Sequence, residues 1–197
     1  MNWTVATPAT KDPVDLETAK QHCRVEDEVS LDDALIGVYL KAATRWVEEY
    51  TGRDLMAKTR RVSVPGFPRR LYLPNGAPNA AIVSVKYYDT TNVQQTLSSS
   101  VYTLVQFSEP GCLMLVDGQT WPSTYTRDDA VIVEYTTGVS APTSVPHDLV
   151  SAVLLLLGHY YANREGVQTG TIAVEIPLAV KDLCAPHRIF LRTPEWA

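Results

Sequence analysis

Histidine and cysteine pairs near the two ends of the sequence come closest to a chemical site. His22-Cys23 and Cys184-Ala-Pro-His187 together offer four nitrogen and thiolate ligands, the set that holds zinc tetrahedrally if the two segments meet. Neighbouring side chains on a helix diverge, so His22 and Cys23 are poorly oriented to bind one ion together. Cysteine is also a common buried residue. We therefore predict no metal site and interpret these cysteines as structural.

Familiar catalytic motifs are absent from the sequence. It has no Gly-x-Ser-x-Gly elbow, no phosphate-binding loop, no Gly-x-Gly-x-x-Gly and no His-Glu-x-x-His. The acidic pairs Asp32-Asp33 and Asp128-Asp129 fall at an expected helix start and in an expected turn, which are common places for aspartate. We predict no catalytic residue, no cofactor and no enzymatic activity. A metal-dependent enzyme domain is the alternative from another class, and metal analysis of the purified protein would reveal it.

The charge of the chain argues against a protein that grips nucleic acid. It carries 17 lysines and arginines against 22 aspartates and glutamates, a formal net charge of −5. The pairs Arg60-Arg61 and Arg69-Arg70 are too few for a strong phosphate footprint. DNA that passes the protein without being bound is compatible with this charge. A DNA-binding packaging factor stays an alternative, which salt-sensitive affinity for duplex DNA would support.

Length and composition indicate an ordinary globular protein. The 197 residues are 45% hydrophobic and 20% charged, enough for one large domain or two small ones. Three widely spaced cysteines cannot complete a disulfide framework, which favours a reducing compartment. No signal peptide is visible, and the longest apolar run, residues 149–157, is shorter than a bilayer requires. We expect a soluble protein made inside the cell, with no membrane partner.

Two helices are predicted near the beginning. Asp15 is suited to cap a short helix in the segment DLETAKQHC. Apolar residues then recur at three- and four-residue intervals and predict an amphipathic helix over 31–51: Leu31, Leu35, Val38, Ala42, Trp46 and Tyr50. Gly52 follows where a left-handed cap would end this helix.

The middle of the chain has the pattern of a β-rich module. Short runs rich in valine, threonine and tyrosine alternate with turn clusters such as PNGAPN and DTTN. The runs are TRRVSV, AIVSVKYYD, VYTLVQF, CLMLV and AVIVEYTTG. We predict five or six strands here.

Helical patterns return after Pro146. Residues 147–163 are apolar on nearly every side, so they predict a central buried helix, and a last short helix is predicted near 179–184. The two leading helices are too short for a core of their own and are the best partners for the central one. We therefore predict an α+β fold, in which residues 1–55 and 139–197 form a discontinuous bundle of about four helices. Residues 56–138 are the inserted β-rich module.

Two segments near the end are predicted to bind partners. In TIAVEIP an alternating strand has no hairpin partner, so we expect Ile172, Val174 and Ile176 to dock on a neighbouring subunit by strand addition; packing on the chain's own β module is the alternative. Beyond the last helix, Arg188, Phe190, Arg192 and Trp196 offer the arginine and aromatic anchors that interfaces favour. A frayed end is the alternative there.

Four segments in this order resemble a known family. They are DLETAKQHCRV (15–25), LDDALIGVYLKAATRWVEEYTGRDL (31–55), VPHDLVSAVLLLLGHYYANRE (145–165) and VEIPLAVKDLCAPHR (174–188). The chain resembles the head–tail connector, or adaptor, proteins of long-tailed bacteriophages and gene transfer agents. Tyr87-Tyr88-Asp89 and residues 118–122 (GQTWP) are similar to the longer members of that family.

The resemblance implies a structural protein of a virion, at the head–tail interface, made in the bacterial cytoplasm. Such adaptors form a dodecameric ring under the portal protein, extend the DNA channel and recruit stopper and tail proteins, while the free chain can be monomeric. Double-stranded DNA would pass the lumen without sequence-specific binding, which suits an acidic chain. The C-terminal segment would contact the portal. A stopper or other neck or tail-completion protein is the alternative within this class.

Overall fold

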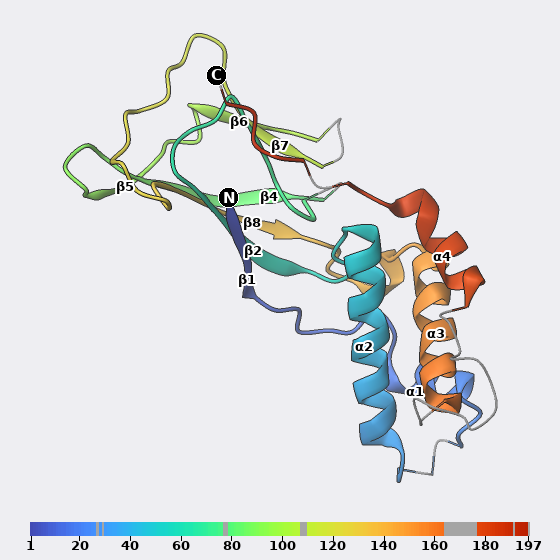
Figure 1. Ribbon diagram of the computed structural model, residues 1–197. Coiled ribbons are helices and arrows are strands. Elements are labelled where there is room, and N and C mark those ends of the chain that lie inside the picture. Colours follow the sequence, from blue (N-terminus) through green and yellow to red (C-terminus); the bar gives the residue numbers. More distant parts are fainter. Residues whose placement is uncertain are drawn as a thin grey trace. The chain divides into compact units, whose positions relative to one another are not determined.

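The computed structural model describes residues 1–26, 28, 30–76, 79–106, 110–163, 177–190 and 192–196. The chain forms two compact units. The first, here the β unit, comprises residues 1–10, 52–139 and 189–197, and the second, the helical unit, comprises residues 11–51 and 140–188. Figure 1 labels the elements of both.

The described part of the helical unit contains four α-helices, as predicted. They are α1 (Leu16–His22), α2 (Asp33–Thr51), α3 (His147–Ala162) and α4 (Leu178–Cys184), with short 3-10 helices η1 (Pro142–Ser144) and η2 (Ala185–His187). The expected cap of α1 is present, since Thr18 N donates to Asp15 Oδ1 at 2.7 Å and thereby lowers the pKa of that carboxyl. The helix boundaries therefore follow local signals in the sequence.

Helix α3 is the centre of the helical unit. It packs against α1, α2 and α4 (Figure 1), which confirms the prediction that the leading helices hold it. Its buried side chains are Leu149, Ala152, Val153, Leu156 and Leu157. Leu155, which is 39% exposed, marks the side that stays open. None of the helices in the described part of the chain combines the length and the apolar composition that crossing a membrane requires.

The side of α2 that faces the core is not the row of apolar residues that the sequence predicted. The apolar side chains that it buries are Ile36, Leu40, Ala43 and Val47. By contrast, Val38 is 62% exposed, and Leu31, which is 90% exposed, precedes the helix, because α2 begins at Asp33 and not at residue 31 as predicted. The helix carries two apolar stripes with the same three- and four-residue spacing, and periodicity alone cannot tell which of them meets α3.

Aspartates at the start of α2 tie the helical unit together. Lys20 of α1, whose side chain is 5% exposed, lies 3.0 Å from Asp33 Oδ1 through its Nζ atom. Tyr161 near the end of α3 donates its hydroxyl proton to Asp32 Oδ2 at 2.6 Å. The pair Asp32-Asp33 therefore connects three helices.

The β unit consists of two antiparallel sheets. In its described residues the strands are β1 (Asn2–Thr7), β2 (Lys58–Val64), β3 (Arg70–Tyr72), β4 (Ala81–Tyr88), β5 (Gln94–Thr96), β6 (Tyr102–Val105), β7 (Cys112–Leu115) and β8 (Val131–Thr137). One sheet has the order β1-β2-β8-β4-β5, and the other has the order β3-β7-β6. Five strands match the predicted runs, whereas β1, β3 and β5 were not predicted, so the strand count of five or six was too low.

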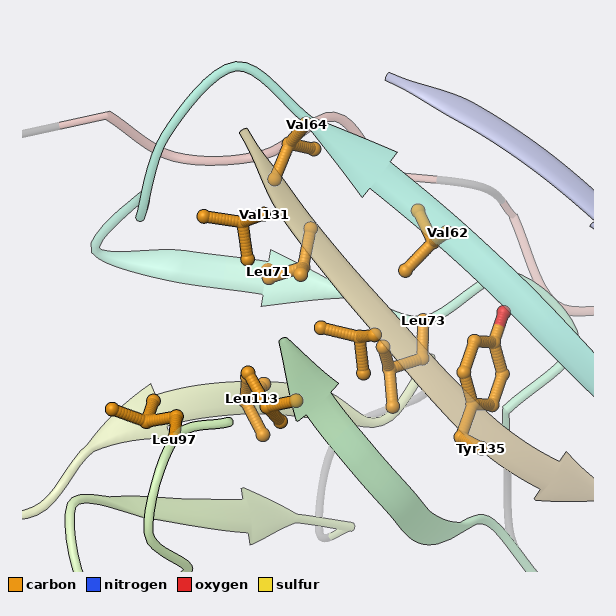
Figure 2. Close-up of a cluster of buried hydrophobic side chains, with 10 residues drawn as sticks. Val62, Val64, Leu71, Leu73, Leu97, Leu113, Val131 and Tyr135 are labelled. Atoms are coloured by element: carbon orange, nitrogen blue, oxygen red, sulfur yellow. The ribbon is translucent and has the colours of Figure 1, made fainter. Parts of the chain in front are cut away.

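The core of the β unit lies between the two sheets. Side chains of β2 and β8 point toward those of β3 and β7, as Figure 2 shows. In β8 every second residue is buried, as expected for a strand with one face in a core. Tyr135 is fully buried there and donates its hydroxyl to Pro74 O at 2.8 Å, and burial raises the pKa of that hydroxyl.

The long central segment of the β unit begins and ends at one place. Met56 pairs with Val139 in a parallel bridge. Ala57 N donates to Val139 O at 2.9 Å, and Val139 N donates to Leu55 O at 3.3 Å. Both chain termini also belong to this unit, whereas residues 1–55 and 139–197 were predicted to form the helical module. Whether the two units are independent domains stays a prediction.

A buried ion pair lies beside this bridge. Asp54, whose side chain is fully buried, accepts two hydrogen bonds from Arg60, at 2.5 and 2.7 Å, and one from the Thr137 hydroxyl at 2.5 Å. Burial alone would raise the pKa of Asp54, but the hydrogen bonds and charge of Arg60 outweigh it and lower that pKa. The ring of Trp3 lies 5.3 Å from the Arg60 guanidinium. The cluster therefore joins β1, β2 and β8.

Candidate partner-binding surfaces

The first predicted partner-binding group falls outside the described residues. Ile172, Val174 and Ile176 belong to the segment between Asn163 and Pro177. Their role as a docking strand stays a prediction. Strand addition needs an acceptor, which is a sheet edge with free backbone groups.

Strand β1 provides such an edge. It pairs with β2 and ends the five-stranded sheet, so no strand in the described chain pairs with its other side. Trp3 and Val5 lie opposite Val62 and Arg60, on the face that continues the core, yet they are 45% and 44% exposed. β1 thus combines an open backbone edge with an exposed apolar face. Its alternation of β-branched and aromatic residues, NWTVAT, was the signal that sequence reasoning missed.

Arg188 belongs to the helical unit. It follows η2, and its guanidinium lies 4.7 Å from the centre of the Tyr50 ring. Tyr50 in turn stacks on Trp46, with ring centres 4.9 Å apart and planes inclined by 11°. Arg188 is therefore held against the last turns of α2 while it remains exposed.

The segment that follows Arg188 is attached to the β unit. Glu195 and Arg70 exchange two backbone hydrogen bonds, at 3.0 and 3.2 Å, so the C-terminal segment pairs with β3. Tyr72 donates its hydroxyl to Glu195 Oε1 at 2.7 Å, and the Arg192 guanidinium lies 5.7 Å from the Tyr72 ring. The C-terminal segment is therefore anchored at Glu195, contrary to the alternative of a frayed end.

The other two predicted tail residues are exposed. Phe190 is 69% exposed and Trp196 is 53% exposed. The structure thus brings Arg192 and Trp196 to the β3 side of the β unit and leaves Arg188 with the helical unit. Glu195 and Tyr72, which hold the segment, were missed, because no local pattern links residues more than 100 positions apart in the sequence.

The four residues weighed as zinc ligands lie in two places. His22 lies beside Gly158, where a Cβ atom would come within 3.0 Å of its Nε2. His187 Nε2 lies 3.4 Å from Asp148 Oδ2. Asp148 precedes Gly158 by ten residues on α3, so the two places are separated by about 15 Å along the helix. Burial also raises the pKa of the Cys184 thiol to about 11, which keeps it protonated. Among the described residues no three histidine, cysteine or acidic side chains form a group that could hold a metal.

Comparison with known families gives one match. The model of the family described as "Head completion protein" matches residues 15–177, which include helices α1, α2 and α3 and the entire segment 52–139 and end just before α4. This is more than half of the chain. None of the curated proteins matches the chain.

Comparison with solved structures finds the same fold over the whole chain. A chain of "Neck of empty GTA particle computed with C6 symmetry" matches with a TM-score of 0.79 at 20% identity. Chains of "Neck of native GTA particle computed with C12 symmetry" and "Virion of native gene transfer agent (GTA) particle" match with TM-scores of 0.77 and 0.74, at 21% and 22% identity. In each case the match covers 98% of this chain and 98% of the other.

Proposed function

The chain belongs to the family of head completion proteins, and we propose that it acts as the head–tail adaptor of a phage or gene transfer agent particle. The role of this family is structural, not enzymatic. The proposal goes further: copies of the chain form a ring under the portal, extend the DNA channel and recruit stopper or tail proteins. The observation that carries it is the family match over both halves of the helical unit and the inserted segment.

We infer a ring of twelve copies in the particle. Two of the similar structures were computed with sixfold and twelvefold symmetry, which twelve copies satisfy. The free chain is proposed to be monomeric or weakly associated, so that the ring becomes stable on the portal, where many subunit contacts act together. With a net charge of −5 the chain would repel phosphate and let duplex DNA pass.

The segment TIAVEIP, residues 171–177, is assigned to contacts between subunits. Ile172, Val174 and Ile176 are proposed to add to a sheet edge of a neighbouring copy, and the open edge of β1 is the acceptor that suits them. β1 has six residues and exposes Trp3 and Val5 on one face, so an alternating apolar strand would extend both the hydrogen bonding and the apolar surface.

The C-terminal residues are assigned to the portal. Phe190 and Trp196 expose most of their aromatic surface on a segment that is fixed at Glu195. Arg188 and Arg192 add cationic groups beside them. Anchored aromatic and arginine side chains lose little conformational freedom on binding, which suits an interface.

Particles from a producing cell test the adaptor role. Replacement of both Phe190 and Trp196 by alanine leaves the Glu195 anchor in place, and we expect DNA-filled heads that lack this protein. Truncation after Arg188 should have the same result. A matched control is Val93→Ala, which changes an exposed side chain of the β unit far along the sequence from the tail. Normally tailed particles from the double variant would contradict the proposal.

Direct binding to the portal distinguishes an adaptor from a stopper. Purified portal rings should bind the full chain without any other neck protein. If binding requires a second neck protein, the chain is a stopper, and the ring immediately under the portal belongs to another protein.

A further inference from the structure

The anchored C-terminal segment places Trp196 across from Arg69. Arg70 and Glu195 exchange two backbone hydrogen bonds in an antiparallel pair, so the residue before Arg70 lies opposite the residue after Glu195. Opposite residues of such a pair have neighbouring side chains on the same side of the backbone. Arg69 is exposed, and Trp196 is 53% exposed. An arginine and a tryptophan are therefore presented next to each other to solvent.

The turn that carries this arginine, residues 65–68, is fixed by aromatic packing. Phe67 stacks on Trp121 of the loop between β7 and β8, with ring centres 4.6 Å apart and planes inclined by 5°. Both rings pack against the core of the β unit. A Cβ atom at Gly66 would lie 4.0 Å from Cζ3 of Trp196, so the tryptophan ring lies over this turn, and Figure 1 shows the C-terminal end beside the same loop.

Tyr72 holds Glu195 from inside the β unit. Its side chain is almost fully buried, with the residue 2% exposed, and its hydroxyl donates to Glu195 Oε1 at 2.7 Å. Arg70 Nη1 lies 3.7 Å from the other carboxylate oxygen of Glu195. Tyr72 cannot contact a partner protein directly, because almost none of its surface is accessible. Any effect of its hydroxyl on partner binding must therefore pass through Glu195 and the neighbouring Trp196.

Arg69 carries a positive charge that no residue of the described chain neutralises. The acidic residue beside it, Glu195, is engaged by Tyr72 and Arg70. No ion pair or hydrogen bond joins the Arg69 side chain to any residue that the structure describes. An exposed guanidinium without a counter-charge favours a carboxylate on the partner, which it can bind through two parallel hydrogen bonds. The ring of Trp196 favours an apolar side chain next to that carboxylate.

We propose that Arg69 and Trp196 bind an acidic segment of the portal protein, and that Tyr72 is the positioning residue of this contact. The proposal rests on the assignment of the C-terminal segment to the portal and names the chemistry of the partner segment. The arginine binds a carboxylate, the tryptophan covers an adjacent apolar side chain, and the hydrogen bond from Tyr72 to Glu195 keeps the tryptophan beside the arginine. Both anchors are fixed before binding, so little conformational freedom is lost.

Binding of the full chain to purified portal rings tests the charge. Arg69→Gln removes the charge from the proposed contact, and Arg61→Gln is the matched control with the same net charge. Arg61 is 54% exposed and pairs with Glu134 on the neighbouring strand. Arg69→Gln should bind at least about fivefold more weakly than the unaltered chain, and its affinity should fall less steeply as the salt concentration rises. Arg61→Gln should match the unaltered chain in both measurements.

Two tyrosine variants test the positioning role. Tyr72→Phe and Tyr135→Phe each remove one buried hydroxyl from the β unit, and that of Tyr135 donates to Pro74 O at 2.8 Å. Each substitution should lower the unfolding midpoint slightly. Only Tyr72→Phe should weaken binding to portal rings, by about threefold or more. Equal affinities of the two variants for portal rings would show that Tyr72 is structural and does not position the contact.

Other results overturn the proposal in distinguishable ways. If the unaltered chain does not bind portal rings, the adaptor role fails and this contact fails with it. If the unaltered chain binds and Arg69→Gln binds equally well, the adaptor role stands and the contact lies elsewhere on the chain. If Arg69→Gln leaves portal binding unchanged but weakens binding to a short DNA duplex, Arg69 faces phosphate. If it instead weakens association between copies of the chain in sedimentation velocity, the partner is a second copy.

Discussion

Asp54 and Arg60 depend on each other because both side chains are almost fully buried, with 0% and 7% of their surface exposed. Asp54→Asn keeps the shape of the side chain but leaves the guanidinium without its counter-charge. Removing one partner of a buried pair typically costs about 3–5 kcal/mol in the free energy of unfolding. We expect a loss of that size in urea denaturation.

An exposed pair supplies the control. Arg45 and Glu49 lie 2.8 Å apart on α2 with 80% and 65% of their side chains exposed. Glu49→Gln should change the free energy of unfolding by no more than about 0.5 kcal/mol. Equal losses in the free energy of unfolding from the two substitutions would show that burial does not determine how much the Asp54–Arg60 pair contributes to stability.

Lowered carboxyl pKa values predict loss of stability in acid. The pKa of Asp54 lies below its ordinary value of 3.8, and hydrogen bonds from Thr91 and Gln95 lower that of Asp89 to about 2. Between pH 4 and 2 the unfolded chain therefore binds more protons than the folded chain, so the free energy of unfolding falls as the pH falls. These two carboxylates contribute no slope between pH 5 and 7, where they are ionised in both states. The Asp54→Asn variant should show a shallower fall in acid, and a slope identical to that of the unaltered protein would contradict this explanation.

At the scale of elements, the sequence was informative where the determinants are local. Asp15, Gly52 and the mostly apolar segment of α3 defined helices correctly, since caps and periodicity act within a few residues. The side of α2 that faces the core could not be chosen, because that choice depends on α3, a hundred residues away. Strands β3 and β5 have three residues each, which is too short for an alternating pattern.

The end of α2 allows a graded test of glycine. Gly52 has a φ of +67°, and a Cβ atom there would lie 2.6 Å from Ile189 O. Gly52→Ala should therefore cost more than the roughly 1–2 kcal/mol of left-handed backbone alone. Gly118, with a φ of +78° and open space around it, isolates the backbone cost, and Gly37 within α2 should tolerate alanine with a gain of about 0.5–1 kcal/mol.

Thermal unfolding of the three alanine variants gives the order. We expect the melting temperature to rise for Gly37→Ala, fall for Gly118→Ala and fall furthest for Gly52→Ala. If the melting temperatures of Gly52→Ala and Gly118→Ala fall equally, Ile189 does not pack tightly against Gly52.

At the scale of the whole molecule, the candidate surfaces were only partly accessible to sequence reasoning. Exposed aromatic residues beyond the last helix were predicted as such, and Phe190 and Trp196 are exposed. The anchoring of that segment to β3, and the edge position of β1, depend on pairings between the two ends and the middle of the chain. Such long-range pairings leave no signature in one sequence.

The meeting of Met56 with Val139 makes the segment between them an insertion whose ends are adjacent. We propose that the helical unit is a domain that folds without the inserted segment. When that segment is removed, α3 keeps all of its helical neighbours, α1, α2 and α4. A chain that joins residues 11–51 to 140–188 through a short glycine–serine linker should be helical by circular dichroism and unfold cooperatively. The same chain with Leu156→Asp, which places a charge in the centre of the core, should not fold. If the joined chain without that substitution is also unfolded, the helical unit depends on the β unit for its stability, and the two form one domain.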